Sequence, residues 1–367
     1  MDPFLLAEVV GGVGMLTLNR PQALNALSLE MVRGLNAWLS AWQRDPAVHA
    51  VALRGSNKQG YFGHFCAGGD IRYFHQLALA GDPALEDFFT EEYALNHLIH
   101  HFDKPLITFL DGVVMGGGMG LCQGASHRLV TARTKMAMPE TIIGLFPDVG
   151  GGYFLARCPG SSGEWLALTG ETVGPQAAIA LGLADRMIEA DVLAPSWDAL
   201  GQLDWSGADP LPAWLEEFVP QVSPGADAGL ETALINQHFS HASVVGIVRS
   251  LSADRSPWAQ HTADLLRKRS PLLLHVALEH VRRARVMNLA DDLRMERDMI
   301  RHCFHPHHLG RSGAETDTVE GIRALVIDKD QQPRWNPSRI EDVTPDMVVP
   351  FFESSWPAAA HPLRHLR

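Results

Sequence analysis

Cysteine is scarce in this sequence, and its few cysteines are far apart. The 367-residue chain contains Cys66, Cys122, Cys158 and Cys303, and no two of them form a CxxC pair. This wide spacing argues against both a paired-cysteine zinc site and a disulfide framework. Because a chain of this length buries a large core without disulfides, we expect a protein of a reducing, cytoplasmic compartment.

Long hydrophobic runs are also missing. Hydrophobic residues make up 46% of the chain, yet no segment reaches the roughly 18 uninterrupted apolar residues that indicate a membrane span. The first residues, "MDPFLLAEVVGGVGMLTLNR", lack the basic start and continuous apolar stretch of a signal peptide. We therefore expect no membrane partner.

Positive charge is in deficit, with a net charge of −12 at pH 7. Such a balance argues against nonspecific nucleic-acid binding, which needs a basic face. It does not exclude an anionic small ligand, because a few local basic side chains or backbone N–H groups are enough to bind one.

Strand and helix patterns alternate in the first half of the chain, which predicts an α/β core. Strand patterns lie at 14–19, 49–55, 104–112 and 127–132, and helix patterns at 28–43, with Ser28 as N-cap, and at 84–102. Turn-forming residues at 195–212 predict a linker or loop. Helix patterns follow at 231–239, 257–269, 271–287 and 289–304. We divide the chain into a core, residues 1–194, and a mostly helical C-terminal region, residues 195–367.

Two glycine-rich segments have the character of ligand-binding turns. In "FCAGGDIRYF" (65–74) and "DGVVMGGGMGL" (111–121), small residues lead into a helix pattern. Backbone N–H groups at such turns can face a ligand oxygen, and a helix N-terminus favours a developing negative charge. A tight turn with Asp70 as N-cap explains the first segment equally well, and close helix–strand packing explains the second. Neither a dinucleotide fingerprint nor a P-loop fits the second segment.

Two acids stand among apolar residues and glycines in "AMPETIIGLFPDVGGGYFL" (137–155). Apolar surroundings raise the pKa of a carboxyl group, which suits acid–base or nucleophilic work by Glu140 and Asp148. Taken singly, each acid is more simply a helix cap, and Asp148 before "VGGGYFLA" fits that interpretation. Together with the two glycine turns, however, the pair resembles the set of groups needed for chemistry on a carbonyl.

The order of these motifs resembles that of the crotonase, or enoyl-CoA hydratase/isomerase, superfamily. The resemblance covers about residues 10–190 and includes "LNRPQALNALSLEMV", "FCAGGDI", "GVVMGGGMGL" and "LALTGETVGPQAAIALGLADRMI". The segments "PETIIGLFPDVGGGYFL" and "EGIRALVIDKDQQPRW" (320–335) are similar to those of the subgroup that hydrolyses 3-hydroxyisobutyryl-CoA. With these two segments the resemblance extends over nearly the whole chain.

The resemblance implies a ββα spiral core with a helical C-terminal region, and an acyl-CoA as substrate. The thioester carbonyl would lie between the amides of Gly69 and Gly117, and no metal and no cofactor other than the CoA of the substrate would be needed. Substrate contacts are implied for Glu92, in "TEEYALN", and for Ala67, Asp70 and Gly116. An exposed helix acid explains Glu92 equally well. Many members form trimers through the helical region, so a homo-oligomer is allowed.

One departure from the water-adding members points to a different reaction. Those members carry a second catalytic glutamate two positions after the glycine triplet, where this chain has Gly120. Because glycine cannot transfer a proton, Gly120 argues against hydration by a two-glutamate route. The resemblance to the hydrolysing subgroup implies instead that Glu140 and Asp148 are the catalytic acids, in the hydrolysis of a short 3-hydroxyacyl-CoA in valine breakdown. The alternatives are another crotonase-type reaction, hydration or isomerisation, and a non-catalytic acyl-CoA-binding protein.

Histidines and basic residues cluster near the C-terminus. "RHCFHPHHLGR" (301–311) resembles a metal site, but Pro306 interrupts any helical face, and a polar loop explains it better. The basic segments 267–271 and 281–286 fit solvated helix faces. They could instead meet the CoA phosphates, together with Lys58 or Lys329, and the sequence does not choose between these interpretations.

Overall fold

The computed structural model describes residues 3–220 and 228–367. The chain forms two compact units, which we call the sheet unit (Met1–Gly69, Ala94–Ala137 and Thr172–Leu230) and the helical unit (Asp70–Tyr93, Met138–Glu171 and Glu231–Arg367). Each unit is therefore assembled from three separate stretches of sequence. The division that the sequence suggested at residue 194 stays a prediction.

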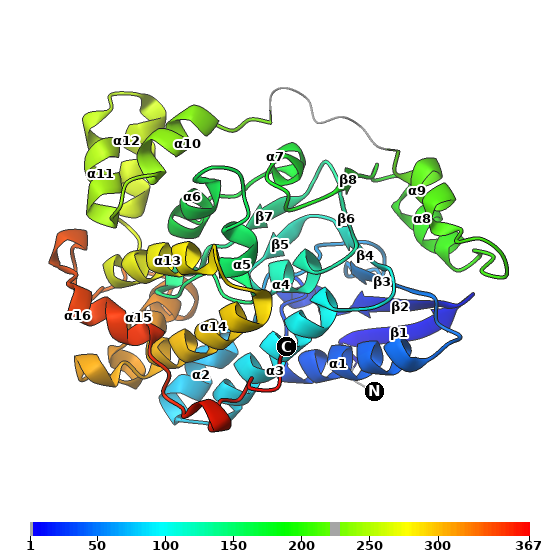
Figure 1. The fold of residues 1–367 in the computed structure, drawn as a ribbon, viewed down its shortest axis with the longest axis horizontal. Coiled ribbons are helices and arrows are strands. Elements are labelled where there is room, and N and C mark those ends of the chain that lie inside the picture. The colour runs from blue at the N-terminus through cyan, green and yellow to red at the C-terminus, as the bar shows by residue number, and fades with distance from the viewer. Residues whose placement is uncertain (1–2, 221–227) are drawn as a thin grey trace. The chain divides into compact units, whose positions relative to one another are not determined.

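The sheet unit is built on a mostly parallel β-sheet (Figure 1). Its strands lie in the order β1 (Leu5–Val10), β2 (Val13–Leu18), β3 (Ala50–Gly55), β4 (Leu106–Leu110), β6 (His127–Val130) and β8 (Arg186–Met187). β1 pairs antiparallel with β2, and the pairs that follow are parallel. A second parallel pair joins β5 (Val113–Met115) to β7 (Lys135–Ala137). The strands predicted at 14–19, 49–55, 104–112 and 127–132 are confirmed.

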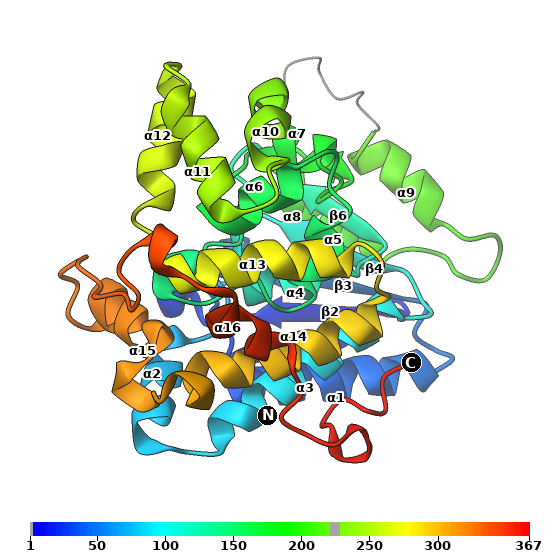
Figure 2. The same cartoon turned by 60° about the vertical axis from the view of Figure 1, so that its left-hand side comes forward.

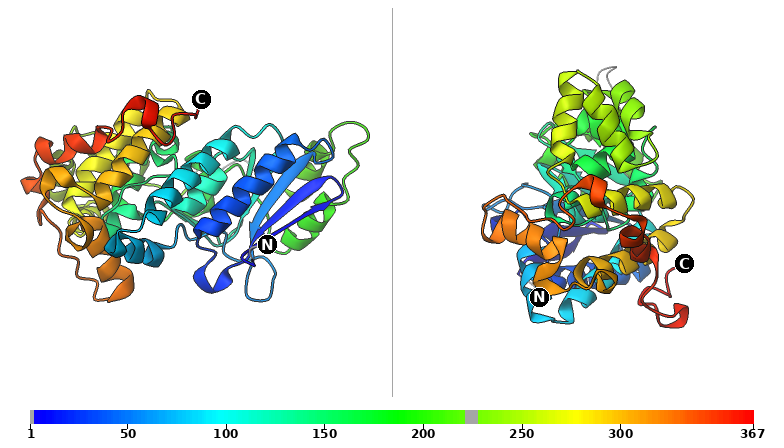
Figure 3. Two further views of the ribbon diagram at one scale, coloured as in Figure 1. Left: turned by 90° about the horizontal axis from the view of Figure 1, so that it is seen from below. Right: turned by 90° about the vertical axis from the view of Figure 1, so that its left-hand side faces the viewer.

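Helix α1 (Leu29–Arg44) covers one face of this sheet (Figure 3). Its N-cap is confirmed, since the Ser28 hydroxyl accepts a hydrogen bond from the amide of Met31. A Cβ on Gly14 of β2 would lie 2.4 Å from the Trp42 ring, so glycine is what allows the helix to pack closely here. Helices α4 (Gly117–Gln123) and α7 (Pro175–Ala180) also belong to this unit.

The opposite face is covered by α8 (Leu193–Leu200) and α9 (Leu211–Phe218) (Figure 1). The linker or loop predicted at 195–212 is therefore confirmed for residues 201–210, which join the two helices, and is wrong at both ends. Leu193, Trp197 and Leu200 follow helical spacing and pack in one buried cluster with sheet residues such as Phe109. The proline and glycine residues of this segment lie at the ends of the two helices or between them. Their abundance hid a short amphipathic pattern.

The helical unit contains the helices that the sequence predicted in the C-terminal region. The described helices are α2 (Ile71–Ala80), α3 (Ala84–His100, in this unit up to Tyr93), α5 (Gly151–Leu155), α6 (Ser162–Thr169), α10 (Thr232–Phe239), α11 (Val244–Ala253), α12 (Pro257–Leu266), α13 (Pro271–Ala284), α14 (Leu289–Phe304), α15 (Asp317–Ile322) and α16 (Pro345–Val348). α10, α11 and α12 are neighbours, and α13 packs on both α5 and α6 (Figure 2). Within the described ranges, none of the helices has the length and apolar character to cross a bilayer.

Candidate active site

The helical unit brings the two predicted catalytic acids into one buried cluster. Glu140 begins the short 3-10 helix Glu140–Ile143, and Asp148 lies in the turn that leads into α5. Glu92 and Tyr93, on α3, complete the cluster, and the Tyr93 hydroxyl donates a 2.7 Å hydrogen bond to Asp148 Oδ2. All four side chains are buried.

Two carboxylate oxygens in this cluster have no hydrogen-bond partner among the described residues. They are Glu92 Oε1 and Glu140 Oε2. Leaving a buried polar atom unpaired costs about 1–3 kcal/mol of stability. A role in binding or catalysis is one reason for a protein to keep such an atom. Because Glu92 is only 2% exposed, the alternative that it is an exposed helix acid is wrong.

Burial is the main cause of the raised pKa values of these groups. It raises the pKa of Glu140 well above its ordinary value, and the nearby charge of Asp148 adds to this effect. Burial also raises the pKa of Asp148, to about 6, although the hydrogen bond from Tyr93 opposes the rise. The pKa of Glu92 is raised well above its ordinary value by burial and then by Asp148. A carboxyl group whose pKa is raised toward neutrality, as that of Asp148 is, suits acid–base work.

Asp148 is not the helix cap that its sequence position suggested. The N-cap of α5 is Gly150, which has no side chain to accept a hydrogen bond, and only the backbone carbonyl of Asp148 bonds to the helix, at Gly151 N. Between them, Val149 has a φ of 58°, a left-handed conformation that is strained for a β-branched residue. The backbone beside Asp148 is therefore held in a shape that packing must maintain.

The two glycine segments lie side by side in the sheet unit. Met115 N donates to Cys66 O at 3.0 Å, and Gly68 adopts a φ of +101°. A Cβ on Gly68 would lie 3.3 Å from Met115 O and 3.5 Å from Gly117 N, so the segments approach each other closely at this point. The structure thus brings the neighbourhoods of Gly69 and Gly117 together.

The pairing of the backbone amides agrees with the predicted donors. Ala67 N donates to Leu24 O at 3.1 Å, and Gly68 N contacts Cys66 Sγ at 3.4 Å. The backbone amides of the two residues before Gly69 therefore already have partners within the protein. Gly117 is the first residue of α4, after the N-cap Gly116. Amides in the first turn of a helix have no acceptor within the helix. The donor roles themselves stay a prediction.

Asp70 is the N-cap of α2, which confirms the helix cap that the sequence offered as the alternative to a ligand-binding turn. Its carboxylate accepts a 3.3 Å hydrogen bond from Tyr73 N. Its predicted contact with substrate, like those of Ala67 and Gly116, stays a prediction.

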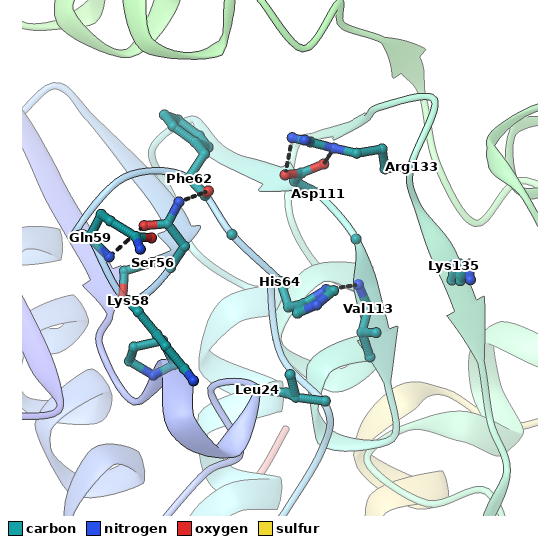
Figure 4. A pocket seen from close by; sticks show the side chains of 14 residues that line it. Leu24, Ser56, Lys58, Gln59, Phe62, His64, Asp111, Val113, Arg133 and Lys135 are labelled. Atoms are coloured by element: carbon teal, nitrogen blue, oxygen red, sulfur yellow. Dashed lines mark hydrogen bonds and ion pairs between the residues drawn. The ribbon is translucent and has the colours of Figure 1, made fainter.

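A pocket of about 710 Å³ opens in the sheet unit and carries several basic side chains (Figure 4). Lys58, Arg133 and Lys135 line it, and Arg133 is paired with Asp111 at 2.7 Å. His64 accepts a 3.1 Å hydrogen bond at Nδ1 from Val113 N, which leaves Nε2 as the protonated nitrogen of a neutral ring (Figure 4). The pocket can hold an anionic group.

The basic and histidine clusters of the C-terminal region have structural partners. Arg282 donates to Ala242 O and His241 O, and Arg285 donates to Glu164 at 2.6 Å. His302 and His308 each contact a backbone carbonyl of a later segment, at 3.1 Å. Within the part of the chain that the structure describes, the buried imidazole and carboxylates that approach one another within 4.8 Å are different ones: His280, Asp292 and Glu296.

Comparison with known proteins decides the family. A family model described as enoyl-CoA hydratase/isomerase matches residues 13–352. The chain belongs to the enoyl-CoA hydratase/isomerase family. A curated relative from Gallus gallus, named 3-hydroxyisobutyryl-CoA hydrolase, mitochondrial, is 37% identical over 355 residues, which cover 95% of this chain and 88% of the relative.

Two crystal structures of this family resemble the chain over almost its whole length. One, described as a carnitinyl-CoA dehydratase from Mycobacterium thermoresistibile, is 37% identical with a TM-score of 0.86 and covers 97% of this chain and 98% of its own. The other, described as an enoyl-CoA hydratase from Rhodobacter sphaeroides 2.4.1, is 35% identical with a TM-score of 0.84. The match covers 96% of this chain and 98% of that structure's chain. The predicted crotonase-type α/β fold is confirmed.

Proposed function

We propose that this protein is an acyl-CoA thioester hydrolase that converts 3-hydroxyisobutyryl-CoA to 3-hydroxyisobutyrate and CoA, a reaction of valine breakdown. The name of the Gallus gallus relative supports the substrate. The observation that carries the proposal is the buried pair Glu140 and Asp148, found in a chain that has Gly120 where water-adding members have their second glutamate.

In the proposed reaction, Glu140 either attacks the thioester carbonyl to form a mixed anhydride or removes a proton from the attacking water. The amides of Gly69 and Gly117 stabilise the oxyanion. CoA leaves as a thiolate, which takes a proton, and water supplies the hydroxyl group of the new acid. Since water is the only co-reactant in this balance, the proposal includes no metal and no cofactor.

Asp148 is assigned to the 3-hydroxyl group of the substrate, which it orients, or to the transfer of a proton. Its hydrogen bond from Tyr93 supports this role, because that bond holds the carboxylate in place. Glu92, with its unpartnered oxygen, is a second contact for the substrate. Ala67, Asp70 and Gly116 complete the proposed substrate contacts.

The phosphates of CoA are assigned to the basic pocket of the sheet unit. Lys58 and Lys135 support this assignment, since both line the pocket and are exposed. We also propose that the enzyme is cytoplasmic, which its four buried, free cysteine thiols support. A homo-oligomer is a separate proposal. Cell fractionation and light scattering test these two statements.

Hydration or dehydration is the second candidate, because the two solved structures carry such activities in their names. Gly120 argues against the route that uses two glutamates, since it offers no proton-transfer group.

A panel of three thioesters separates the candidates. We expect rapid release of free CoA, followed with a thiol reagent, from 3-hydroxyisobutyryl-CoA and 3-hydroxypropionyl-CoA, and little release from crotonyl-CoA. A 3-hydroxyl group is the feature that the first two share. Loss of the enoyl absorbance of crotonyl-CoA without thiol release would replace the hydrolase proposal with hydration.

The oxyanion role of Gly117 can be tested through its backbone amide. Proline is favoured at the first position of a helix, which Gly117 occupies in α4, and it lacks the N–H group. We expect Gly117→Pro to lower kcat roughly 100-fold to 1,000-fold. Gly117→Ala is the matched control, because it adds a Cβ and keeps the amide. Equal kcat values for these two variants, both folded by circular dichroism, would contradict the role.

A further inference from the structure

A second buried charged cluster lies beside the turn that carries Asp148. It consists of His280 on α13 and of Asp292 and Glu296 on α14, and all three side chains have no exposed surface. Asp292 and Glu296 are four residues apart and therefore share one face of their helix. His280 Nε2 lies 3.2 Å from Asp292 Oδ1 and 3.3 Å from Glu296 Oε1.

The carboxylates of this cluster bind the backbone at the start of α5. Glu296 Oε2 accepts from Gly150 N at 2.8 Å, and Glu296 Oε1 accepts from Gly152 N at 3.2 Å. Asp292 Oδ2 accepts from Tyr153 N at 2.7 Å. Every carboxylate oxygen therefore has a donor, so amides and the imidazole occupy the positions that a metal ion would need.

The fit between the cluster and the backbone is close. A Cβ on Gly152 would lie 2.3 Å from His280 Nε2 and 2.5 Å from Asp292 Oδ1, so no other residue fits at this position without displacing the cluster. Gly150 is separated from Asp148 only by the strained Val149. A strained backbone persists where its surroundings hold it in place, and the two bonds from Glu296 hold both sides of Gly151.

We propose that His280, Asp292 and Glu296 form a buried charge clamp whose hydrogen bonds to the Gly150–Tyr153 backbone position Asp148 for the hydrolysis. These three are positioning residues, since they act through the turn and not on the substrate. The inference rests on the catalytic role proposed for Asp148. Buried charges are expensive to keep, and a role in holding a working carboxylate gives a reason to keep these.

The clamp also contributes to the charge balance of the acids. The charge of Glu296 adds to the rise in the pKa of Glu140, whereas the charge of His280 lowers the pKa of Asp148. Burial lowers the pKa of His280 itself, but Asp292 and Glu296 outweigh this and raise it above its ordinary value, so His280 is protonated near neutrality. The titratable groups that influence the cluster around Asp148 come from several elements: Glu92 and Tyr93 of α3, Glu140, His280 of α13, and Asp292, Glu296 and Cys303 of α14.

Two variants of the full chain should displace the pH profile of kcat in opposite directions. Burial raises the pKa of Glu296 to about 8, although the hydrogen bond from His280 opposes the rise, so Glu296→Gln removes a negative charge only where Glu296 is ionised. We therefore expect the limb on which kcat rises with pH to move slightly to lower pH. His280→Gln removes a positive charge, so we expect that limb to move to higher pH. In both variants kcat should fall roughly 10-fold to 100-fold, because the turn is held less firmly, while KM changes little.

A matched control is available in the same unit. His238 is also a fully buried histidine, and it contacts Ser250 Oγ at 2.8 Å and Asp254 Oδ2 at 3.2 Å. His238→Gln therefore removes an equivalent side chain that has no bond to α5, and it should leave the pH profile in place. Thermal unfolding of each variant reports how much stability is lost.

The outcomes separate this inference from the proposed function. If Asp148→Asn is inactive but Glu296→Gln and His280→Gln keep the wild-type kcat and pH profile, the clamp is wrong and the function stands. If Asp148→Asn is fully active, the catalytic role of Asp148 is wrong, and the clamp with it. A metal bound at one equivalent and lost in His280→Gln would also overturn the clamp. Should Glu296→Gln fail to fold, the direction of the shift in His280→Gln decides alone.

Discussion

Glu140→Gln should lower kcat roughly 1,000-fold or more while the protein remains folded. The proposed chemistry needs an ionised carboxylate at this position, as nucleophile or as base, and an amide can serve as neither. KM should change little, because glutamine keeps the size and one oxygen of the side chain. Thiol release from 3-hydroxyisobutyryl-CoA measures both constants.

Glu164→Gln is the matched control for this variant. Glu164 is another buried glutamate of the helical unit, but it is paired with Arg285, the C-cap of α13, and lies outside the acid cluster. Its loss should reduce stability and leave kcat per folded molecule close to that of the wild type. If Glu140→Gln keeps more than about a tenth of the wild-type kcat, Glu140 is not the acting carboxylate.

The pH dependence of the wild type follows from the same residue. Burial and the charge of Asp148 raise the pKa of Glu140 well above its ordinary value, so Glu140 keeps its proton to a higher pH than an exposed glutamate does. Because the reaction uses the ionised form, kcat should rise with pH as Glu140 loses its proton. A kcat that falls over this range would contradict the assignment.

A single turnover in oxygen-18 water distinguishes the two roles of Glu140. If Glu140 is the nucleophile, water opens the mixed anhydride and label enters the Glu140 carboxylate, which mass spectrometry of the peptide containing it detects. If Glu140 is the base, label appears only in the released acid. Either outcome leaves Glu140 in the active site, and the result selects the mechanism.

Local patterns were sufficient to predict those parts of the fold whose stability is local. The cap of α1 at Ser28 and the parallel strands with continuous apolar runs are examples. The window 195–212 was predicted wrongly at its two ends because its turn residues outnumber the few apolar positions, Trp197 and Leu200 among them, that pack against the sheet. Such packing depends on a partner that is distant in the sequence, and no local count of residue types records it.

The candidate site divides in the same way. Glu140 and Asp148 could be found because both lie in one unusual segment, whereas the burial of Glu92 depends on how α3 packs. The bond from Tyr93 joins residues 55 positions apart, and the bonds that Glu296 accepts from Gly150 N and Gly152 N span more than twice that separation. A single sequence, read without an alignment to its relatives, carries no signal for such pairs.

Asp148→Asn should also lower kcat strongly, roughly 1,000-fold, because the neutral amide cannot accept a proton and orients a hydroxyl group less firmly. The Tyr93 hydroxyl can still donate to the remaining oxygen, so the packing should survive. We expect the same assay to show the loss with 3-hydroxyisobutyryl-CoA. Activity equal to the wild type would remove Asp148 from the mechanism.

The same variant should be more stable than the wild type at neutral pH. The folded pKa of Asp148, about 6, lies above its ordinary value of 3.8, so the folded protein binds this proton more tightly than the unfolded chain does. The resulting stabilisation is fully present below pH 3.8 and is lost as the pH rises through about 6. Above that pH the wild type carries a buried charge that costs about 3 kcal/mol, and asparagine carries none.

Urea unfolding at about pH 4 and about pH 8 tests this sign directly. The stability difference between Asp148→Asn and the wild type should be small at the lower pH and should favour the variant, by up to about 3 kcal/mol, at the higher pH. A variant that is less stable at the higher pH would mean that the charge of Asp148 contributes to folding. Gain of stability with loss of activity would instead indicate that the fold retains this carboxylate for chemistry.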